Sequence, residues 1–571
     1  MGEDIGMREK KSYSLYSIFV CWLLITLTVV SSVCKVKIGL DVDESYITYL
    51  AYRLQRGMVL FKDSWDMHTT SAVIPALLLK AFLFFENGRM DGAILFLRIV
   101  SCLFQWLAAL FAFYIFNKNY SGKVAFAVSL VIANMLPRAT QNFEYGFEST
   151  LFLLFFSLII LDVWKNKEEE KYLKIILASV SYAIALFIYP TMIMTLPVVL
   201  AVFILKIDVS GKMKVRYTAL FIMTCFLLFC VMLFYLFKNM TFSELVDSIK
   251  GILMAGDHTG LFSVFGNAKV ILKLVLRCAG LLIIPIVIYA FLRRKYELSI
   301  FFLNSVYCIE MLLVVFIPNI TGIRQSGVYG LLERYIVIAI LAVVVSVKSI
   351  KDREILWLFV LTGFMEFLGA LAGSNLGFCE NAMFLELVLA AYAFQSMCYL
   401  EKNAAGNSFN LAVAKIGIVC FLLDLILSKA YFVRISGTGP ANIFEPRAIA
   451  ENGIYSGLMV DEKWLDTQKN RASFIDQKTQ DEKKYALVSN DPCLNFYFNG
   501  EMTAPQYAPT LSTGEQWVYY YTKAKNELPD EIWIDETDYG VDKFYNSDLG
   551  KYVSDSYSVK NSENGFLILS K

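Results

Sequence analysis

The sequence predicts a polytopic α-helical membrane protein that carries a small α/β domain at its C-terminal end. Apolar residues make up 57% of the 571 residues and charged residues 18%, whereas soluble globular chains average about 45–50% and about 25%. Many segments of roughly 16–23 residues carry few charges, which is enough length to cross a bilayer core. From about residue 430 onward, Asn, Asp, Lys, Tyr and Ser become frequent and the long apolar runs end.

The N-terminal segment has the features of a retained membrane anchor. Residues 1–12 are polar and include three basic side chains, and the apolar run Tyr13–Val33 follows. The end of this run, Val29–Val36, lacks a clear A-x-A cleavage site, so we expect an anchor rather than a cleaved signal peptide. The basic residues place the N-terminus inside.

Fourteen apolar segments, the anchor included, are candidates for membrane spans. The shortest is Val124–Leu136, which is bounded by Pro137, and we expect it to be partial or merged with its neighbour. An inside N-terminus and an outside C-terminal region require an odd number of crossings, so we predict about thirteen. The other candidates are Ser71–Phe85, Ala93–Phe116, Phe147–Trp164, Leu173–Tyr189, Thr191–Leu205, Tyr217–Phe237, Val270–Leu292, Leu298–Phe316, Leu331–Val347, Ile355–Ala372, Met383–Leu400 and Leu411–Leu427.

Basic connectors indicate which loops lie inside. They are Lys165–Lys174, Lys206–Arg216, Arg293–Lys295 and Lys348–Arg353. The remaining loops then fall outside, together with the C-terminal region. These outer loops are the first loop, Thr140–Glu148, Lys238–Ala268, Pro318–Glu333 and Gly373–Asn381.

The C-terminal region is long enough for a small domain of its own. Short runs with β-forming residues alternate there with Pro and Gly, which predicts strands joined by turns. We therefore divide the chain into a membrane module, 1–429, and an extracytoplasmic α/β domain, 430–571. The predicted strands are Tyr485–Ser489, Glu531–Asp535, Tyr552–Val559 and Gly565–Ser570.

The first outer loop, 34–70, contains the longest polar run of the N-terminal half. Within it, Tyr46, Leu50 and Leu54 recur at helical spacing, and Gly57 follows as a helix stop. This pattern predicts an amphipathic helix, Glu44–Arg56, that lies in the membrane interface. Carboxylates at the edge of a bilayer cost free energy, and those that occur there usually serve a function. We therefore take this loop as the candidate catalytic segment.

Two groups of acids are the candidate catalytic residues. The first comprises Asp41, Asp43 and Glu44; each of them could instead cap the helix that follows. The second comprises Glu144 and Glu148, which could instead be a solvated loop edge. Sugar transfer to a hydroxyl or amine needs one carboxylate to take or orient a proton and another to hold the sugar, the acceptor or a metal.

The leaving phosphate of such a transfer gains negative charge and needs cations. Arg is suited to this role because its planar fork donates two hydrogen bonds. Each cation could also simply place its charge among the lipid headgroups. The outer candidates are Arg138, Lys269, Arg324 and Arg334.

Other chemistries find little support. The two histidines are too few for a His-built metal site, and we expect His68 to contact a substrate rather than a metal, although a divalent metal stays possible. The eleven cysteines are scattered, which argues against a disulfide framework. A net charge of +1 suggests no nucleic-acid partner.

At these residues the chain resembles the GT-C glycosyltransferases, which include protein O-mannosyltransferases and the lipid A aminoarabinose transferase. The resemblance covers roughly residues 1–205 by motif and the rest by architecture. Its members place an Asp-Glu pair in the first outer loop, then an interfacial helix that ends near Gly, then a D-x-W-D/E stretch. The matching residues are Asp43–Tyr46, Arg53–Gly57, Asp63–Asp66, the second-loop acid Glu148 with Glu144 next, and the late pair Arg334–Tyr335.

The resemblance implies an inverting transferase of the plasma membrane. Its donor would be a polyprenyl-phosphate sugar, and its acceptor an envelope glycan, lipid or protein on the extracytoplasmic face. Asp43, Glu44 and Glu148 would be catalytic, and Asp41, Asp66, His68 and Glu144 would bind substrates. One departure is Met67–Thr70, where many relatives have Asn-Lys-Pro-Pro, so that the titratable His68 replaces a lysine.

Two other functions fit the same composition. A lipid-linked glycan flippase or transporter would show ionisable groups near the middle of its spans, for which Asp424, Glu310 and Glu366 are candidates. A glycan ligase or polymerase would instead act on lipid-diphosphate glycans. Transfer of label from a polyprenyl-monophosphate sugar separates these functions.

Overall fold

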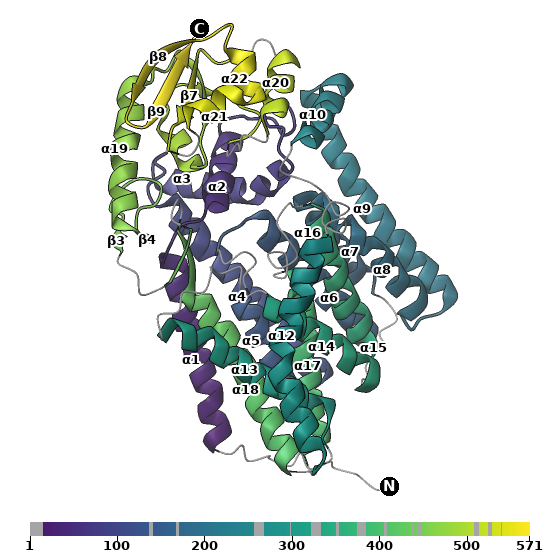
Figure 1. Ribbon diagram of the computed structural model, residues 1–571. Coiled ribbons are helices and arrows are strands. Elements are labelled where there is room, and N and C mark those ends of the chain that lie inside the picture. Colours follow the sequence, from purple (N-terminus) through teal and green to yellow (C-terminus); the bar gives the residue numbers. More distant parts are fainter. Residues whose placement is uncertain are drawn as a thin grey trace.

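The computed structural model shows a tall bundle of helices with a region of strands and short helices over one end (Figure 1). The N-terminal end of α1 lies at the far end of the bundle from the C-terminus. The residues described are 15–135, 141–166, 171–255, 268–296, 298–320, 333–349, 353–373, 384–404, 408–435, 439–442, 447–507, 513–523, 528–537 and 540–571.

Helices occupy all fourteen predicted apolar segments. Among the described residues, six helices are long and apolar enough to span a bilayer, and seven apolar stretches are shorter. The helices of the bundle are α1 (Leu15–Lys37), α3 (Val73–Phe85), α4 (Ala93–Asn119), α5 (Gly122–Asn134), α6 (Tyr145–Lys165), α7 (Tyr172–Ile188), α8 (Leu196–Ala201), α9 (Gly211–Asn239), α12 (Ala268–Arg293), α13 (Ile300–Ile320), α14 (Glu333–Ser349), α15 (Arg353–Ile355), α16 (Leu361–Ala372), α17 (Glu386–Lys402) and α18 (Ser408–Tyr431).

The short segment predicted to be partial forms the separate helix α5. Its 13 residues measure about 20 Å, less than the roughly 30 Å of a bilayer core. It packs against α4, where Ala108, Ala109 and Ala112 are buried and allow a close approach. The length of α5 therefore agrees with a partial span, while the number of crossings stays a prediction.

The C-terminal region contains a five-stranded mixed sheet in the order β6-β5-β7-β9-β8. Strands β6, β5 and β7 are parallel, whereas β9 runs antiparallel to both β7 and β8. The strands are β1 (Phe432–Ile435), β2 (Gly439–Asn442), β3 (Ala448–Ile449), β4 (Met459–Val460), β5 (Lys484–Val488), β6 (Glu501–Met502), β7 (Glu531–Asp535), β8 (Ser558–Glu563) and β9 (Phe566–Ser570). The helices are α19 (Glu462–Lys478), α20 (Gly514–Lys523), α21 (Val541–Asn546) and α22 (Asp548–Val553).

The predicted strand Tyr552–Val559 is wrong at its beginning. Tyr552 and Val553 end helix α22, and β8 starts only at Ser558. The reason is local, because the Ser547 hydroxyl accepts a hydrogen bond from the Gly550 backbone and caps a helix. The other three predicted strands are confirmed as β5, β7 and β9.

The first outer loop shares a hydrophobic core with the C-terminal region. Helix α2 (Val42–Gln55) confirms that this segment is helical, and Gly57, where φ is +97°, follows its C-terminal cap Arg56. Its Tyr49 ring packs edge-on against Phe496 and Tyr507, each at 4.9 Å between centroids. The division into two domains at residue 430 stays a prediction, and it would cut through this shared core.

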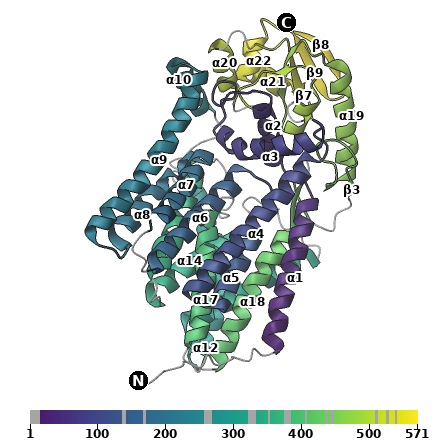
Figure 2. The same cartoon turned by 180° about the vertical axis from the view of Figure 1, so that it is seen from behind.

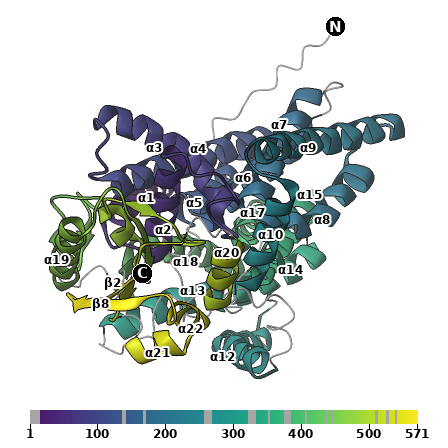
Figure 3. The ribbon, with the colours of Figure 1, turned by 90° about the horizontal axis from the view of Figure 1, so that it is seen from above.

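A second connection reaches the C-terminal region from the opposite side of the bundle. Helix α10 (Phe242–Met254) follows the long helix α9 and lies beside α20 (Figures 1 and 2). The Tyr519 hydroxyl donates to Asp247 at 2.8 Å. Seen from above, the strands cover one side of the bundle, and α7 to α9 lie on the other (Figure 3). Helix α10 therefore connects the two sides.

Candidate functional site

The start of α2 is fixed by a capping box. The Asp41 carboxylate accepts from the Asp43 backbone at 2.9 Å, and the Glu44 carboxylate accepts from the Asp41 backbone at 3.0 Å. Asp41 therefore caps the helix, which was the alternative open from the sequence. Both side chains are also buried.

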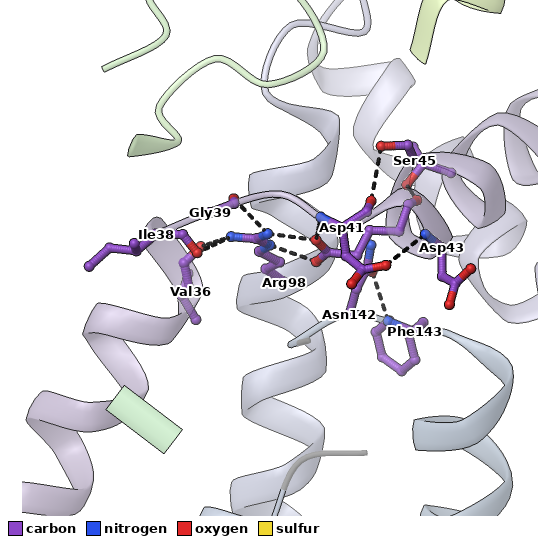
Figure 4. Close-up of polar contacts among 11 residues, drawn as sticks. Val36, Ile38, Gly39, Asp41, Asp43, Ser45, Arg98, Asn142 and Phe143 are labelled. Atoms are coloured by element: carbon purple, nitrogen blue, oxygen red, sulfur yellow. Dashed lines mark hydrogen bonds and ion pairs between the residues drawn. The ribbon is translucent and has the colours of Figure 1, made fainter. Parts of the chain in front are cut away.

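Glu44 forms a buried ion pair with Arg98 of α4 (Figure 4). Two arginine nitrogens donate to the two carboxylate oxygens at 2.7 and 2.6 Å. The same guanidinium donates to the backbone oxygens of Val36, Ile38 and Gly39. Arg98 thereby joins the end of α1 to the start of α2, and both oxygens of Glu44 are already occupied.

Sequence reasoning missed Arg98, although a signal existed. It is the sixth residue of a long apolar helix, where a charged side chain is unfavourable unless it is paired. The first outer loop was the nearest rich source of carboxylates. An arginine at this depth thus indicated a partner in that loop.

Asp43 differs from Glu44 in its surroundings. Its side chain points away from the Arg98 ion pair (Figure 4), and the residue is partly exposed. The segment before α6 lies against the same end of α4, because Gln141 donates to Ser101 at 3.3 Å. Asn142, the next residue, is drawn beside Asp41 in the close-up. The two acidic segments predicted from the sequence therefore lie near one end of α4.

Tyr46 lies near both Asp43 and Asp66. Burial raises the pKa of Tyr46 well above its usual value, and the negative charges of Asp66 and Asp43 raise it further. The tyrosine stays protonated at neutral pH and can donate a hydrogen bond. From the sequence, Tyr46 was part of an apolar stripe and the last residue of the matched motif Asp43–Tyr46, and its closeness to Asp66 was missed.

His68 joins the loop to the start of α6. Its backbone N–H donates to Asp66 at 2.7 Å. Its ring stacks on Tyr145 with 3.7 Å between centroids and 9° between planes, and Tyr189 lies edge-on to His68 at 5.6 Å. His68 thus contacts the rings of Tyr145 and Tyr189, neither of which was a candidate site residue from the sequence.

The second acidic pair has two different environments. Glu144 caps α6 and accepts from the backbones of Gly146 and Phe147 at 2.8 and 2.7 Å. Glu148 lies one turn further and is completely buried. Neither of its carboxylate oxygens has a hydrogen-bond partner among the described residues. A buried carboxylate without partners is strongly unfavourable, so Glu148 is the more unusual of the two.

The candidate cations are only partly covered by the structure. Arg138 and Arg324 lie outside the described residues. Arg334 is the second residue of α14 and its side chain is not described, whereas Lys269 is exposed near the start of α12. In the described part of the chain, no three His, Cys, Asp or Glu side chains are placed to hold a metal ion.

Comparisons with known proteins identify similar folds. The oligosaccharyltransferase of Archaeoglobus fulgidus, solved with Zn and sulfate, has a TM-score of 0.51 and 10% identity, over 97% of this chain and 72% of that chain. ArnT from Cupriavidus metallidurans, solved with undecaprenyl phosphate, has a TM-score of 0.44 and 9% identity, over 98% of both chains. Neither a protein-family model nor a curated protein matches the sequence.

The archaeal likeness extends over nearly the whole chain and includes both the helical bundle and the C-terminal region. Together with the six membrane-length helices among the described residues, it confirms the fold class expected from the sequence. The chain is a multi-pass membrane protein whose fold is similar to that of the archaeal oligosaccharyltransferase.

Proposed function

We propose that this protein transfers a sugar from a polyprenyl-phosphate donor to an envelope glycan, lipid or protein on the extracytoplasmic face. One observation carries the proposal. Asp43, Asp66 and Tyr46 come together where apolar helices meet a polar region. His68 connects this cluster to the acidic start of α6. The GT-C fold, which an oligosaccharyltransferase shares, supports the transferase class.

The roles follow from these surroundings. Asp43, partly exposed and outside the Arg98 ion pair, takes the proton from the acceptor hydroxyl or amine. The acceptor atom then bonds to the anomeric carbon while the bond from that carbon to the phosphate oxygen breaks. Tyr46 and Asp66 orient the acceptor. Glu44 holds the start of α2 through Arg98, and we assign it a positioning role.

Glu148 is proposed to bind the sugar. Its two oxygens are buried and have no partner within the described residues, so they can accept hydrogen bonds from sugar hydroxyls. Glu144 keeps the start of α6 in place through its two backbone contacts. The donor phosphate needs a cation, and Arg334 stays our candidate because it begins a membrane helix directly after a predicted outer loop.

A labelled donor tests the proposal. Purified full-length protein in lipid vesicles would receive polyprenyl-monophosphate sugars with a radiolabelled sugar, together with extracted envelope material. We expect the label to move to the acceptor and unlabelled polyprenyl phosphate to accumulate. Movement of intact labelled lipid across the bilayer, without cleavage, would identify a transporter instead. Label transfer only from lipid-diphosphate donors would identify a ligase or polymerase.

A further inference from the structure

A cavity of about 260 Å³ lies at the far end of α2 from Asp43. The end of α2, the loop that follows it, β6 and α20 all contribute to its walls. The polar side chains that line it are Arg53, Arg56, Asp63, Glu501, Thr503 and Tyr520. None of these residues was given a role in the reaction above.

Two buried polar atoms of this wall have no hydrogen-bond partner in the part of the chain that the structure describes. They are Nε of Arg53 and Oγ1 of Thr503. Buried polar atoms are nearly always hydrogen-bonded to protein or to ordered water, which a polar ligand can replace. Thr503 is also held firmly, because its backbone donates to Tyr485 and accepts from the Tyr521 hydroxyl. Both residues line the cavity, so a donor and an acceptor without partners among the described residues lie in its wall.

The charges of the cavity balance. Arg53 and Arg56 contribute two positive charges, and Asp63 and Glu501 contribute two negative ones. Asp63 and Glu501 both act on Arg53 and favour its charged form. A multiply charged phosphate would gain little here, because the two negative charges of the wall offset its two positive charges. An uncharged ligand rich in hydroxyl groups can instead accept from the guanidinium groups and donate to the carboxylates.

The apolar parts of the wall suit the same class of ligand. Met58 and Met502 line the cavity together with the ring of Tyr520, which packs edge-on against Trp65 at 4.9 Å. Sugar rings present C–H groups between their hydroxyls, and such rings need both kinds of contact. Binding sites commonly combine an apolar lining with a few placed polar groups.

We propose that this cavity binds a neutral saccharide unit of the acceptor, remote from the reacting hydroxyl. The inference rests on the proposed function and specifies the acceptor as a glycan. Arg53 follows Asp43 by ten residues in the same helix, which corresponds to about 15 Å. One monosaccharide cannot span this distance, whereas a short oligosaccharide can.

Direct binding to the full-length protein in lipid nanodiscs tests the proposal. The probes are neutral tetrasaccharides with glucose, mannose, xylose or N-acetylglucosamine units, observed by saturation-transfer NMR. We expect at least one series to bind the parent protein. Arg56→Gln should weaken that binding about tenfold. Arg89→Gln is the matched control, since Arg89 is also exposed and lies outside the cavity, and it should bind like the parent.

Thr503→Val tests the buried wall, with circular dichroism as the check on folding, and it should also weaken binding. Binding of none of the probes to the parent, or equal binding by Arg56→Gln and the parent, would overturn the proposal. So would displacement of the sugar by millimolar inorganic phosphate, which would indicate an anion site. Saccharide binding without any transfer from labelled donor would reject the proposed function and leave the cavity assignment intact. Sugar transfer from the labelled donor without saccharide binding would reject the cavity assignment and leave the proposed function intact.

Discussion

At the scale of single residues, neighbouring acids at the start of α2 have different fates. Successive residues of a helix point in different directions, so Glu44 faces Arg98 while Asp43 lies outside that ion pair. Asp41 is used in the capping box. Of these three acids, Asp43 is therefore the one that we propose to meet a substrate.

Replacing Asp43 with Asn keeps the size of the side chain and removes its charge. We expect transfer to fall about 100-fold or more, because general-base catalysis contributes about 10²–10⁴-fold. Initial rates with the labelled donor measure the effect. Asp542→Asn is the matched control, since Asp542 is also in the first turn of a helix but is exposed in the C-terminal region. Full activity in a folded Asp43→Asn protein would reject the assignment.

Replacing Arg98 with Lys retains the charge but loses the two-pronged contact with Glu44. We expect a loss of stability smaller than the loss of about 3–5 kcal/mol that follows removal of one partner, because lysine keeps the charge but cannot make all the contacts of the guanidinium. Thermal unfolding of the full-length protein measures it, with the exposed Arg89→Lys as control. An unchanged melting temperature would show that the ion pair does not hold α1 and α2 together.

At the scale of elements, helix α10 depends on a glycine. A Cβ atom at Gly251 would lie 2.1 Å from the Trp65 ring. That ring is held in place, because the Trp65 backbone donates to Pro505 at 2.8 Å and accepts from Gln516 at 2.6 Å. The close approach of α10 to the first outer loop therefore requires the absence of a side chain.

Gly251→Ala should loosen this contact even though alanine favours a helix by about 1 kcal/mol. We expect faster hydrogen exchange around Trp65 and a lower melting temperature. Gly280→Ala is the control, because its added Cβ meets no atom within 4 Å. Equal hydrogen-exchange rates around Trp65 in the two variants would show that the close packing of α10 at Gly251 does not stabilise the first outer loop.

The elements also show what sequence reasoning could reach. The position of α2 was predictable to within about two residues because its cap, Asp41 with Glu44, and its stop, Gly57, are local features that flank the helix in the sequence. The contact between Glu44 and Arg98 joins residues 54 positions apart, and that between Trp65 and Gln516 joins residues 451 positions apart. No local pattern encodes such pairings. The acids of the candidate site were therefore found, while the groups that hold them were not.

At the scale of the whole molecule, the remaining question is the orientation in the membrane. The positive-inside rule places the connector that contains Lys212 inside and the C-terminal region outside. Asn499 and Lys212 are both exposed, and they lie in these two regions. Cysteines introduced at these two positions should therefore differ in their reaction with a membrane-impermeant reagent, and this difference tests on which side of the membrane the candidate site lies.

Asn499→Cys should react with a membrane-impermeant thiol reagent in intact cells, and Lys212→Cys should react only after the cells are opened. The unsubstituted chain is the control for native cysteines, of which Cys493 is buried. Labelling is measured by a mass shift on gels. The reverse pattern would place the candidate site on the cytoplasmic side and contradict the proposed use of an extracytoplasmic acceptor.

The core shared by α2 and the C-terminal region sets an order of events during biosynthesis. The loop that carries Asp43 leaves the ribosome early, but its packing partners such as Phe496 and Tyr507 come more than about 400 residues later. At roughly 5–20 residues per second, the nascent loop waits about 20–80 s for them. The apolar face of α2 lacks these partners during that interval, so we expect the loop to reach its folded arrangement only after the C-terminal region has been made.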